Sequence, residues 1–246
     1  MCSHVCEQAF NPNEKTVVVG IKGTSTLKDV FTDILCRTSA FLPSTYAHDG
    51  IMIAARRIVL RIHSFIENLF IPLGYRIVCT GHSLGAGVAC LTAMILHDEL
   101  HISNVRAYAY ATPPVLDKTA ALGCKDYVIS VVHERDIISR TSLSNMNIMH
   151  ETLFQVAQMI KVGKLNNESI VKTDHGEEDD PITGLDLLEK VRSIQKEYKL
   201  DYEQDLYVPG RVLYMFKGGN GRYEVLEKDG TLTGLRTMLI CKTMFR

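Results

Sequence analysis

The sequence predicts an α/β fold with a mostly parallel central sheet and helices on both of its faces. Short β-branched runs alternate along the chain with longer segments of helical periodicity, in the order strand, helix, strand, helix, strand. The chain has 246 residues, which suits one α/β domain, and 46% of them are hydrophobic, which is enough for a substantial core. We therefore expect residues 1–246 to form a single domain.

The strands are expected where apolar β-branched residues cluster. The runs KTVVVGI at 15–21 and YRIVCT at 75–80 are typical of buried strands, and two more are expected at 105–111 and 127–133. Towards the end of the chain, strands are expected at 207–216, at 223–228 and from 232 onward. The pair Asp229-Gly230 is a strong hairpin signal between the last two.

Helices are expected where apolar residues recur every three or four positions, at 28–35, 51–70, 84–100, 143–161 and 186–200. Pro72 and Gly74 end the second of these, and the third is apolar enough to be buried along its whole length. Residues 162–205 begin with a polar stretch that includes the acidic run 177–180, so we expect them to form an insertion.

Composition excludes several classes of protein. A net charge of −1 gives no basic surface for nucleic acid. The seven cysteines are scattered without a CxxC pair, which predicts buried thiols in a reducing compartment and neither a metal site nor a disulfide framework. No cofactor is expected. Charges interrupt the apolar segment 51–70, and no signal peptide is visible, so the expected location is the cytoplasm or the cytoplasmic face of a membrane.

The segment Gly81-His82-Ser83-Leu84-Gly85 matches the pattern G-x-S-x-G between an expected strand and an expected helix. That context is typical of the nucleophile elbow of the α/β-hydrolase fold. The two glycines relieve crowding in the tight turn, and Ser83 is expected to sit exposed at the top of the sheet. His82 is interpreted as a packing residue under the elbow, because the sharp turn directs neighbouring side chains apart.

An acid should follow a later strand, since the order of the triad in this fold is Ser, then Asp or Glu, then His. Asp136 lies just beyond the strand expected at 127–133. Glu134 competes for the same role, and Asp117 and Asp126 compete less well. Position alone favours Asp136 over Glu134 without excluding the latter.

The oxyanion of an acyl-transfer reaction needs two hydrogen-bond donors. The backbone N–H of Leu84 is expected to be one, and Thr24, in the loop after the first strand, the other. The alternative for Thr24 is to cap the following helix, although Ser25 or Thr26 can also do so.

Four segments together resemble the class 3 lipases. VVVGIKGTSTLKDVFTDIL is similar to that family's opening strand and R-G-T loop, with Lys22 in place of arginine. TGHSLGAGVACLTA and YAYATPPVLD are similar to its elbow and following strand. VVHERDIISRTS is similar to its acid-bearing D-x-V-P-R segment, with Ile138 and Ser139 in place of Val-Pro, whereas Arg140 and Ser142 keep the pattern. The resemblance favours Asp136 as the acid.

Within that family, the long segment after Asp136 and the run LYVPGRVLYM resemble the diacylglycerol lipases. The resemblance implies a serine lipase that faces the cell interior, is associated with a membrane surface and hydrolyses an acyl ester of a glycerolipid, most readily diacylglycerol. Ser83 would attack the ester, Thr24 and Leu84 would hold the oxyanion, and Asp136 would orient a histidine. The alternatives are a catalytically inactive lipid-binding module and an esterase of the phospholipase A1 type.

The histidine is the missing member of the triad. After Asp136 the chain contains only His150, on an expected helix, and His175, in the polar insertion. We therefore expect the chain to be truncated at its C-terminus, with the catalytic histidine beyond Arg246. Residues 36–47 place Phe41, Leu42 and Tyr46 around Pro43, and are interpreted either as a lid at the lipid interface or as a loop packed on the sheet.

Overall fold

The computed structural model describes residues 6–23, 38–134, 136–161, 189, 193 and 205–229. They fall into two compact units. The first contains the described residues up to Ser142 together with 205–229, and the second contains the helix α5 (Leu143–Lys161) with Glu189 and Ser193. The candidate site lies in the first unit, and the prediction of a single domain stays a prediction.

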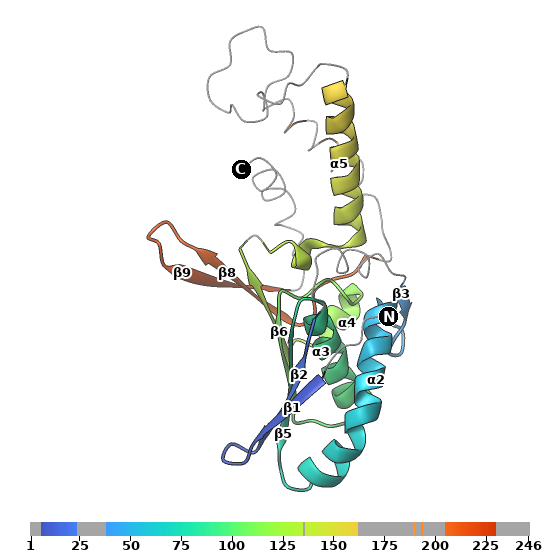
Figure 1. Cartoon of the computed structure of the whole chain (residues 1–246), viewed down its shortest axis with the longest axis vertical. Helices are drawn as coiled ribbons and strands as arrows, with labels where there is room; N and C mark the ends of the chain where they lie inside the picture. Colours follow the sequence, from blue (N-terminus) through green and yellow to red (C-terminus); the bar gives the residue numbers. More distant parts are fainter. Residues whose placement is uncertain are drawn as a thin grey trace. The chain divides into compact units, whose positions relative to one another are not determined.

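The first unit is built on a seven-stranded sheet (Figure 1). Its strands lie side by side in chain order: β1 (Cys6–Asn11), β2 (Thr16–Ile21), β5 (Arg76–His82), β6 (Val105–Tyr110), β7 (Val128–His133), β8 (Arg211–Lys217) and β9 (Tyr223–Asp229). Strands β2, β5, β6, β7 and β8 are parallel, and β1 and β9 pair antiparallel at the two ends of the order. The carboxyl ends of the parallel strands therefore share one edge of the sheet.

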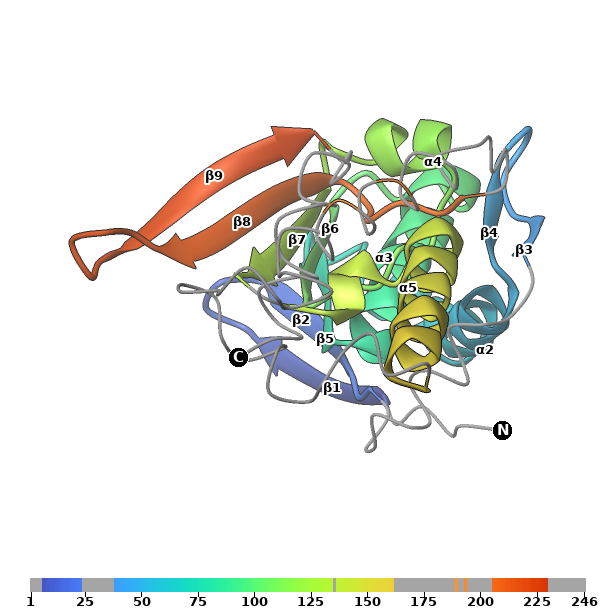
Figure 2. The ribbon, with the colours of Figure 1, turned by 90° about the horizontal axis from the view of Figure 1, so that it is seen from above.

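The helices of this unit lie on one face of the sheet (Figure 2). They are α2 (Asp49–Phe65), α3 (Leu84–Met94) and α4 (Lys118–Gly123), and α2 and α3 each continue into a π-helical turn, η1 (Ile66–Phe70) and η2 (Ile95–Glu99). Each parallel strand lies on the same side of its predecessor, so right-handed crossovers bring the helices to the same face.

Burial along β6 agrees with this arrangement. Val105, Ala107 and Ala109 are buried beneath the helices, whereas Tyr108 and Tyr110 on the other side of the strand are exposed. Helices were predicted on both faces of the sheet. In the described part of this unit they cover one face. All residues of α3 are buried, as its apolar composition predicted.

The long elements agree with the sequence-based predictions to within a few residues. The strands β2, β5, β6, β7 and β9 and the helices α2, α3 and α5 lie where they were expected, while β8 begins four residues later, at Arg211. The shorter elements β1, β3 (Thr38–Ala40), β4 (Tyr46–His48) and α4 were not predicted. The helix expected at 28–35, the strand from 232, Gly230 and nearly all of the insertion 162–205 lie outside the described residues.

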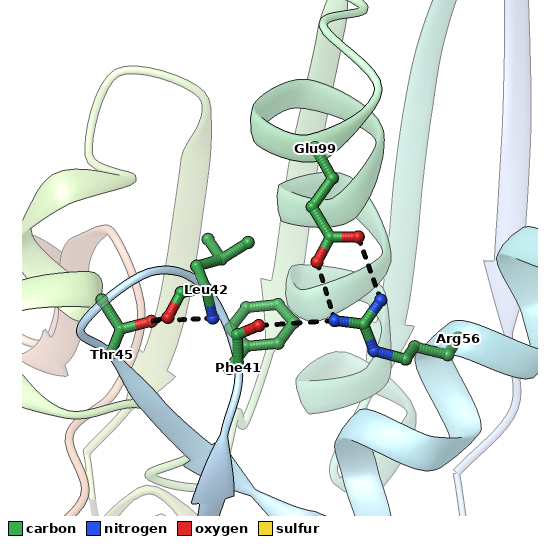
Figure 3. Close-up of polar contacts among 5 residues, drawn as sticks. All are labelled: Phe41, Leu42, Thr45, Arg56 and Glu99. Carbon is green, nitrogen blue, oxygen red and sulfur yellow. Dashed lines mark hydrogen bonds and ion pairs between the residues drawn. The ribbon is translucent and has the colours of Figure 1, made fainter.

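The segment interpreted as a lid or a packed loop forms the small hairpin β3–β4 against α2. Phe41 is buried, with 7% of its surface exposed, whereas Tyr46 is exposed. Arg56 of α2 binds both carboxylate oxygens of Glu99 at 2.7 and 2.9 Å, and also donates to the Phe41 carbonyl at 3.4 Å (Figure 3). The tip of the hairpin is therefore tied to α2 and η2, and of the two interpretations the packed loop fits Phe41 but not Tyr46.

The run LYVPGRVLYM has a structural role at the start of β8. Tyr207 pairs through its backbone with Leu116, which pairs in turn with Ala47 of β4. Gly210 has φ +73°, and a Cβ there would lie 2.2 Å from the Val128 carbonyl oxygen. Only glycine therefore fits this close approach of two backbones.

The described cysteines confirm the prediction of buried thiols. Cys79, Cys90 and Cys124 are buried, and none of the three forms a disulfide. Burial raises the pKa of the Cys124 thiol to about 12 and that of Cys90 well above its ordinary value. Over the part of the chain that the structure describes, no helix is long and apolar enough to span a bilayer, and no group of three His, Cys, Asp or Glu side chains is placed to bind a metal.

Candidate active site

Ser83 stands on a sharp turn between β5 and α3. Its backbone has φ 57° and ψ −129°, a left-handed conformation that is costly for a residue with a Cβ. The Ser83 N–H donates to the Tyr110 carbonyl of β6 at 2.9 Å, and the Ser83 carbonyl accepts from the Ala86 N–H of α3 at 2.9 Å. The turn is thus held on both sides, and Ser83 occupies the N-cap position of α3, where the helix dipole favours negative charge.

Glycines allow three backbone segments to meet around this turn. A Cβ on Gly81 would lie 2.4 Å from the Gly85 carbonyl oxygen, and one on Gly85 would lie 2.4 Å from the Ile21 carbonyl oxygen. A Cβ on Gly23 would lie 2.5 Å from the His82 carbonyl oxygen. The prediction that Gly81 and Gly85 relieve crowding agrees with these distances. Gly23 likewise allows the loop after β2 to approach the backbone of the elbow closely.

Two predictions about side chains in the elbow are wrong. Ser83 is buried, with 6% of its surface exposed, rather than exposed at the top of the sheet. His82 is exposed and does not pack under the elbow. Because the side chains of β5 alternate, His82 shares the exposed side of the sheet with its neighbour Tyr110 on β6, whereas Cys79 lies under the helices.

The two predicted oxyanion donors differ in what the structure shows. Leu84 is buried as the first residue of α3, and the first N–H groups of a helix have no acceptor within it. Its N–H is therefore suited to an external oxyanion. Thr24 lies outside the described residues. The residue before it, Gly23, packs against the backbone of the elbow.

Asp136 lies in the loop after β7, at the same edge of the sheet as Ser83 and two strands away from it. Its Oδ1 accepts from the Ile138 N–H at 2.9 Å, and its Oδ2 accepts from the Ser139 hydroxyl at 3.2 Å. The carboxylate is half-buried and is held by the 3₁₀ turn η3 (Ile138–Arg140). The contact with Ser139 was not predicted, and its only sequence signal was a serine in place of the family's proline.

Arg140 braces the loop that carries Asp136. Its guanidinium donates to the Asp136 carbonyl and, at 2.7 Å, to the Glu134 carbonyl. Burial lowers the pKa of Arg140, while the charge of Asp136 and the nearby Tyr214 act in the opposite direction. The loop backbone is therefore fixed by a half-buried cation.

The competing carboxylates have other roles. Glu134 accepts from the Lys217 N–H at 2.6 Å and so joins the end of β7 to β8. Asp117 caps α4 through the N–H groups of Thr119 and Ala120, and also accepts from the Tyr46 N–H. Asp126 is exposed before the amino end of β7, far along the strand from the edge that carries Ser83.

Neither of the histidines that follow Asp136 belongs to the first unit. His150 is exposed on α5, in the second unit. His175 lies outside the described residues. The first unit thus holds the candidate nucleophile and the candidate acid on one edge of the sheet.

A family model described as "Lipase (class 3)" matches residues 18–146, just over half of the chain. The chain belongs to the class 3 lipases. The matched residues run from β2 through Ser83 and Asp136 to the start of α5, so the family match covers the edge of the sheet on which the candidate site lies.

Two diacylglycerol lipases resemble the chain over different lengths. It is 35% identical to the diacylglycerol lipase-beta of Mus musculus over 152 residues, which is 58% of this chain and 22% of that protein. It is 26% identical to the diacylglycerol lipase-alpha of Homo sapiens over 227 residues, 84% of this chain and 22% of that protein. The chain thus spans about a fifth of the length of these relatives.

Among solved structures, the fold resembles a triacylglycerol lipase whose catalytic centre is formed by a serine protease triad. The TM-score is 0.60, with 14% identity over 97% of this chain and 74% of the other. At that identity the likeness establishes the α/β-hydrolase fold of this class 3 lipase, which agrees with the sequence-based prediction.

Proposed function

We propose that this chain is a serine lipase that hydrolyses an acyl ester of a glycerolipid, with diacylglycerol as its preferred substrate. The observation that carries the proposal is the backbone of Ser83. It is held at φ 57° between β5 and the N-terminus of α3, a strained conformation of the kind that accumulates at functional sites. Family membership supports a hydrolytic lipase, and the diacylglycerol lipases among its relatives support the substrate.

The proposed reaction has two steps on Ser83. Its Oγ attacks the ester carbonyl carbon while a histidine takes the hydroxyl proton, and the N–H of Leu84 and Thr24 stabilise the oxyanion. The bond to the glycerol oxygen breaks, and the alcohol leaves with that proton. Water then attacks the acyl-enzyme, assisted by the same base, and releases the fatty acid. Asp136 orients the histidine throughout.

Several observations suit these roles. Ser83 and Asp136 share the carboxyl edge of the sheet, and the strands that carry them are separated by β6 alone. Two strand spacings amount to roughly 10 Å, a gap that an imidazole between the two side chains can bridge. Of the four carboxylates considered from the sequence, Asp136 is the one that lies at this edge without bonding another strand through its side chain.

The decisive test is labelling by a fluorophosphonate, which reacts with activated serines. We expect a chain that contains the base to label and its Ser83→Ala variant not to. His150→Ala and His175→Ala identify the base, because loss of labelling follows loss of the base. Labelling that arises only when further C-terminal sequence is added assigns the base to that sequence. A folded protein that fails to label in both forms contradicts the proposal and favours a lipid-binding module.

The substrate is tested separately with mixed micelles. Dioleoylglycerol should be hydrolysed faster than phosphatidylcholine, with fatty acid release abolished by Ser83→Ala. Faster release from the first glycerol position of phosphatidylcholine would instead assign a phospholipase A1-type activity to the same serine.

A further inference from the structure

The side chain of Ser139 contacts the carboxylate of the candidate acid. Its hydroxyl donates to Asp136 Oδ2 at 3.2 Å, and the neighbouring Ile138 N–H donates to Oδ1 at 2.9 Å. Ser139 is buried, with 2% of its surface exposed. A hydroxyl held in a buried turn has few orientations, so both carboxylate oxygens of Asp136 are fixed by donors from η3.

A serine at this position is a feature of the chain itself. In the D-x-V-P-R pattern that this segment resembles, the corresponding residue is proline. Proline has neither a hydroxyl nor a backbone N–H. Proline stiffens the backbone of such a turn. Ser139 instead restrains the carboxylate directly, through a bond to the oxygen.

We propose that Ser139 is a positioning residue that sets the orientation and the acceptor strength of Asp136. A carboxylate oxygen has two lone pairs, so Oδ2 keeps one for the histidine while Ser139 occupies the other. The inference rests on the proposed function, because it assigns Ser139 to the acid of that reaction. It adds a residue that acts through Asp136 and touches neither substrate nor Ser83.

Two consequences separate this role from simple packing. The hydroxyl draws charge from Oδ2, so its removal makes Asp136 a stronger partner for a protonated histidine and raises the pKa of that histidine. The carboxylate also becomes freer to rotate, which reduces the fraction of time spent in the productive orientation.

The groups that surround Asp136 come from its own loop and from the strands beside it. The Arg140 guanidinium donates a hydrogen bond to the Asp136 carbonyl, and the Asp136 N–H donates to the His133 carbonyl at 2.8 Å. The Glu134 carboxylate accepts from the backbone N–H of Lys217, and the Tyr214 hydroxyl of β8 donates to the Glu134 carbonyl at 3.1 Å. These groups are unchanged in a Ser139 variant, so they do not account for a difference between that variant and the wild type.

The experiment compares three substitutions in the same turn. Ser139→Ala removes the donor, and Ser139→Thr keeps it. Thr141→Val is the matched control, because the buried Thr141 hydroxyl donates to the Ile138 carbonyl at 2.7 Å and not to the carboxylate. For each variant, kcat and KM for a soluble short-chain ester are measured across pH, together with thermal unfolding.

Ser139→Ala should lower kcat by about tenfold with KM unchanged. It should also move the acid limb of the kcat/KM profile to higher pH by roughly half a unit. Ser139→Thr should restore both values, and Thr141→Val should lower the melting temperature without moving the limb. A Ser139→Ala profile that matches the wild type, or a shift equal to that of Thr141→Val, overturns the inference.

A second readout needs no turnover. The ¹³C chemical shift of the Asp136 carboxyl carbon reports the hydrogen bonds that the carboxylate accepts. It should change in Ser139→Ala and stay in place in Thr141→Val. If neither this chain nor its C-terminally extended form labels or turns over, the proposed function fails, while this shift still decides whether Ser139 controls the Asp136 carboxylate.

Discussion

Glu134 accepts a hydrogen bond from the backbone N–H of Lys217, with 2.6 Å between Oε1 and the nitrogen. The Glu134 N–H donates in turn to the Met215 carbonyl at 2.7 Å, so this residue continues the pairing of β7 with β8 beyond the last paired residues. Two residues later, Asp136 directs its carboxylate to its own turn. Two acids close together in sequence are thereby separated into a structural role and a candidate catalytic role.

This separation predicts opposite outcomes for two conservative substitutions. Asp136→Asn should reduce kcat by about 10³- to 10⁴-fold, because a neutral amide no longer stabilises the charged histidine. Glu134→Gln should stay within about threefold of the wild type, because the amide oxygen can still accept from Lys217. Ester hydrolysis and the melting temperature are measured for both. Equal losses of activity would show that Glu134 takes part in the reaction.

The glycines of the elbow predict a large difference between two Gly→Ala substitutions. In Gly81→Ala the new Cβ would meet the Gly85 carbonyl oxygen at 2.4 Å, so the backbone must move, and we expect a loss of about 2 kcal/mol or more of unfolding free energy. Gly123→Ala, at the end of α4, meets nothing within 4 Å and should leave stability unchanged or raise it by about 0.5 kcal/mol. Urea unfolding measures both, and similar midpoints would contradict the packing described for Gly81.

The buried thiols predict a loss of stability in alkali. The pKa of Cys124 rises from 9.0 to about 12 on folding because burial disfavours the thiolate. A group whose pKa is raised in the folded state contributes its full stability below the unfolded pKa, near 9, and loses it as pH rises towards 12. The expected slope is about 1.4 kcal/mol per pH unit for such a thiol.

Urea unfolding between pH 8 and pH 11 measures this slope. Cys124→Ala should be less stable at pH 8 but should fall less steeply as pH rises. A thiol reagent at pH 8 should modify Cys79, Cys90 and Cys124 only after unfolding. Rapid modification of any of the three in the folded protein would show that its burial is incomplete.

The parts of the fold that the sequence predicted are those whose signal is local. Runs such as VVVGI and RIVC are β-branched and apolar because their strands are buried, and the uniformly apolar stretch after Ser83 marks a helix that is buried all round. The strand β1 has the sequence CEQAFN, which lacks such a run. It is a strand because it pairs with β2, and not because its own residues favour the extended conformation. The three-residue strands β3 and β4 and the six-residue helix α4 are too short to show a period.

In the candidate site too, the features with a local sequence signal were predictable and the others were not. The motif around Ser83 was predictable because the turn requires glycines at fixed positions, which a sequence displays directly. The burial of Ser83 and the exposure of His82 depend on which face of the sheet the helices cover, which no local pattern encodes. The bond between Ser139 and Asp136 depends on the path of a turn, and the sequence showed only a replaced proline.

The connection between β7 and β8 has a consequence for how this sheet tolerates change. These strands are immediate neighbours, yet residues 134–210 separate them along the chain. The entropic cost of closing a loop grows only with the logarithm of its length, by about 0.6 kcal/mol for each doubling. Sequence added to this connection should therefore cost the sheet little stability. Regulatory segments or reporter domains inserted in this connection after η3 should leave Ser83 and Asp136 in their places on the edge that β5 and β7 define.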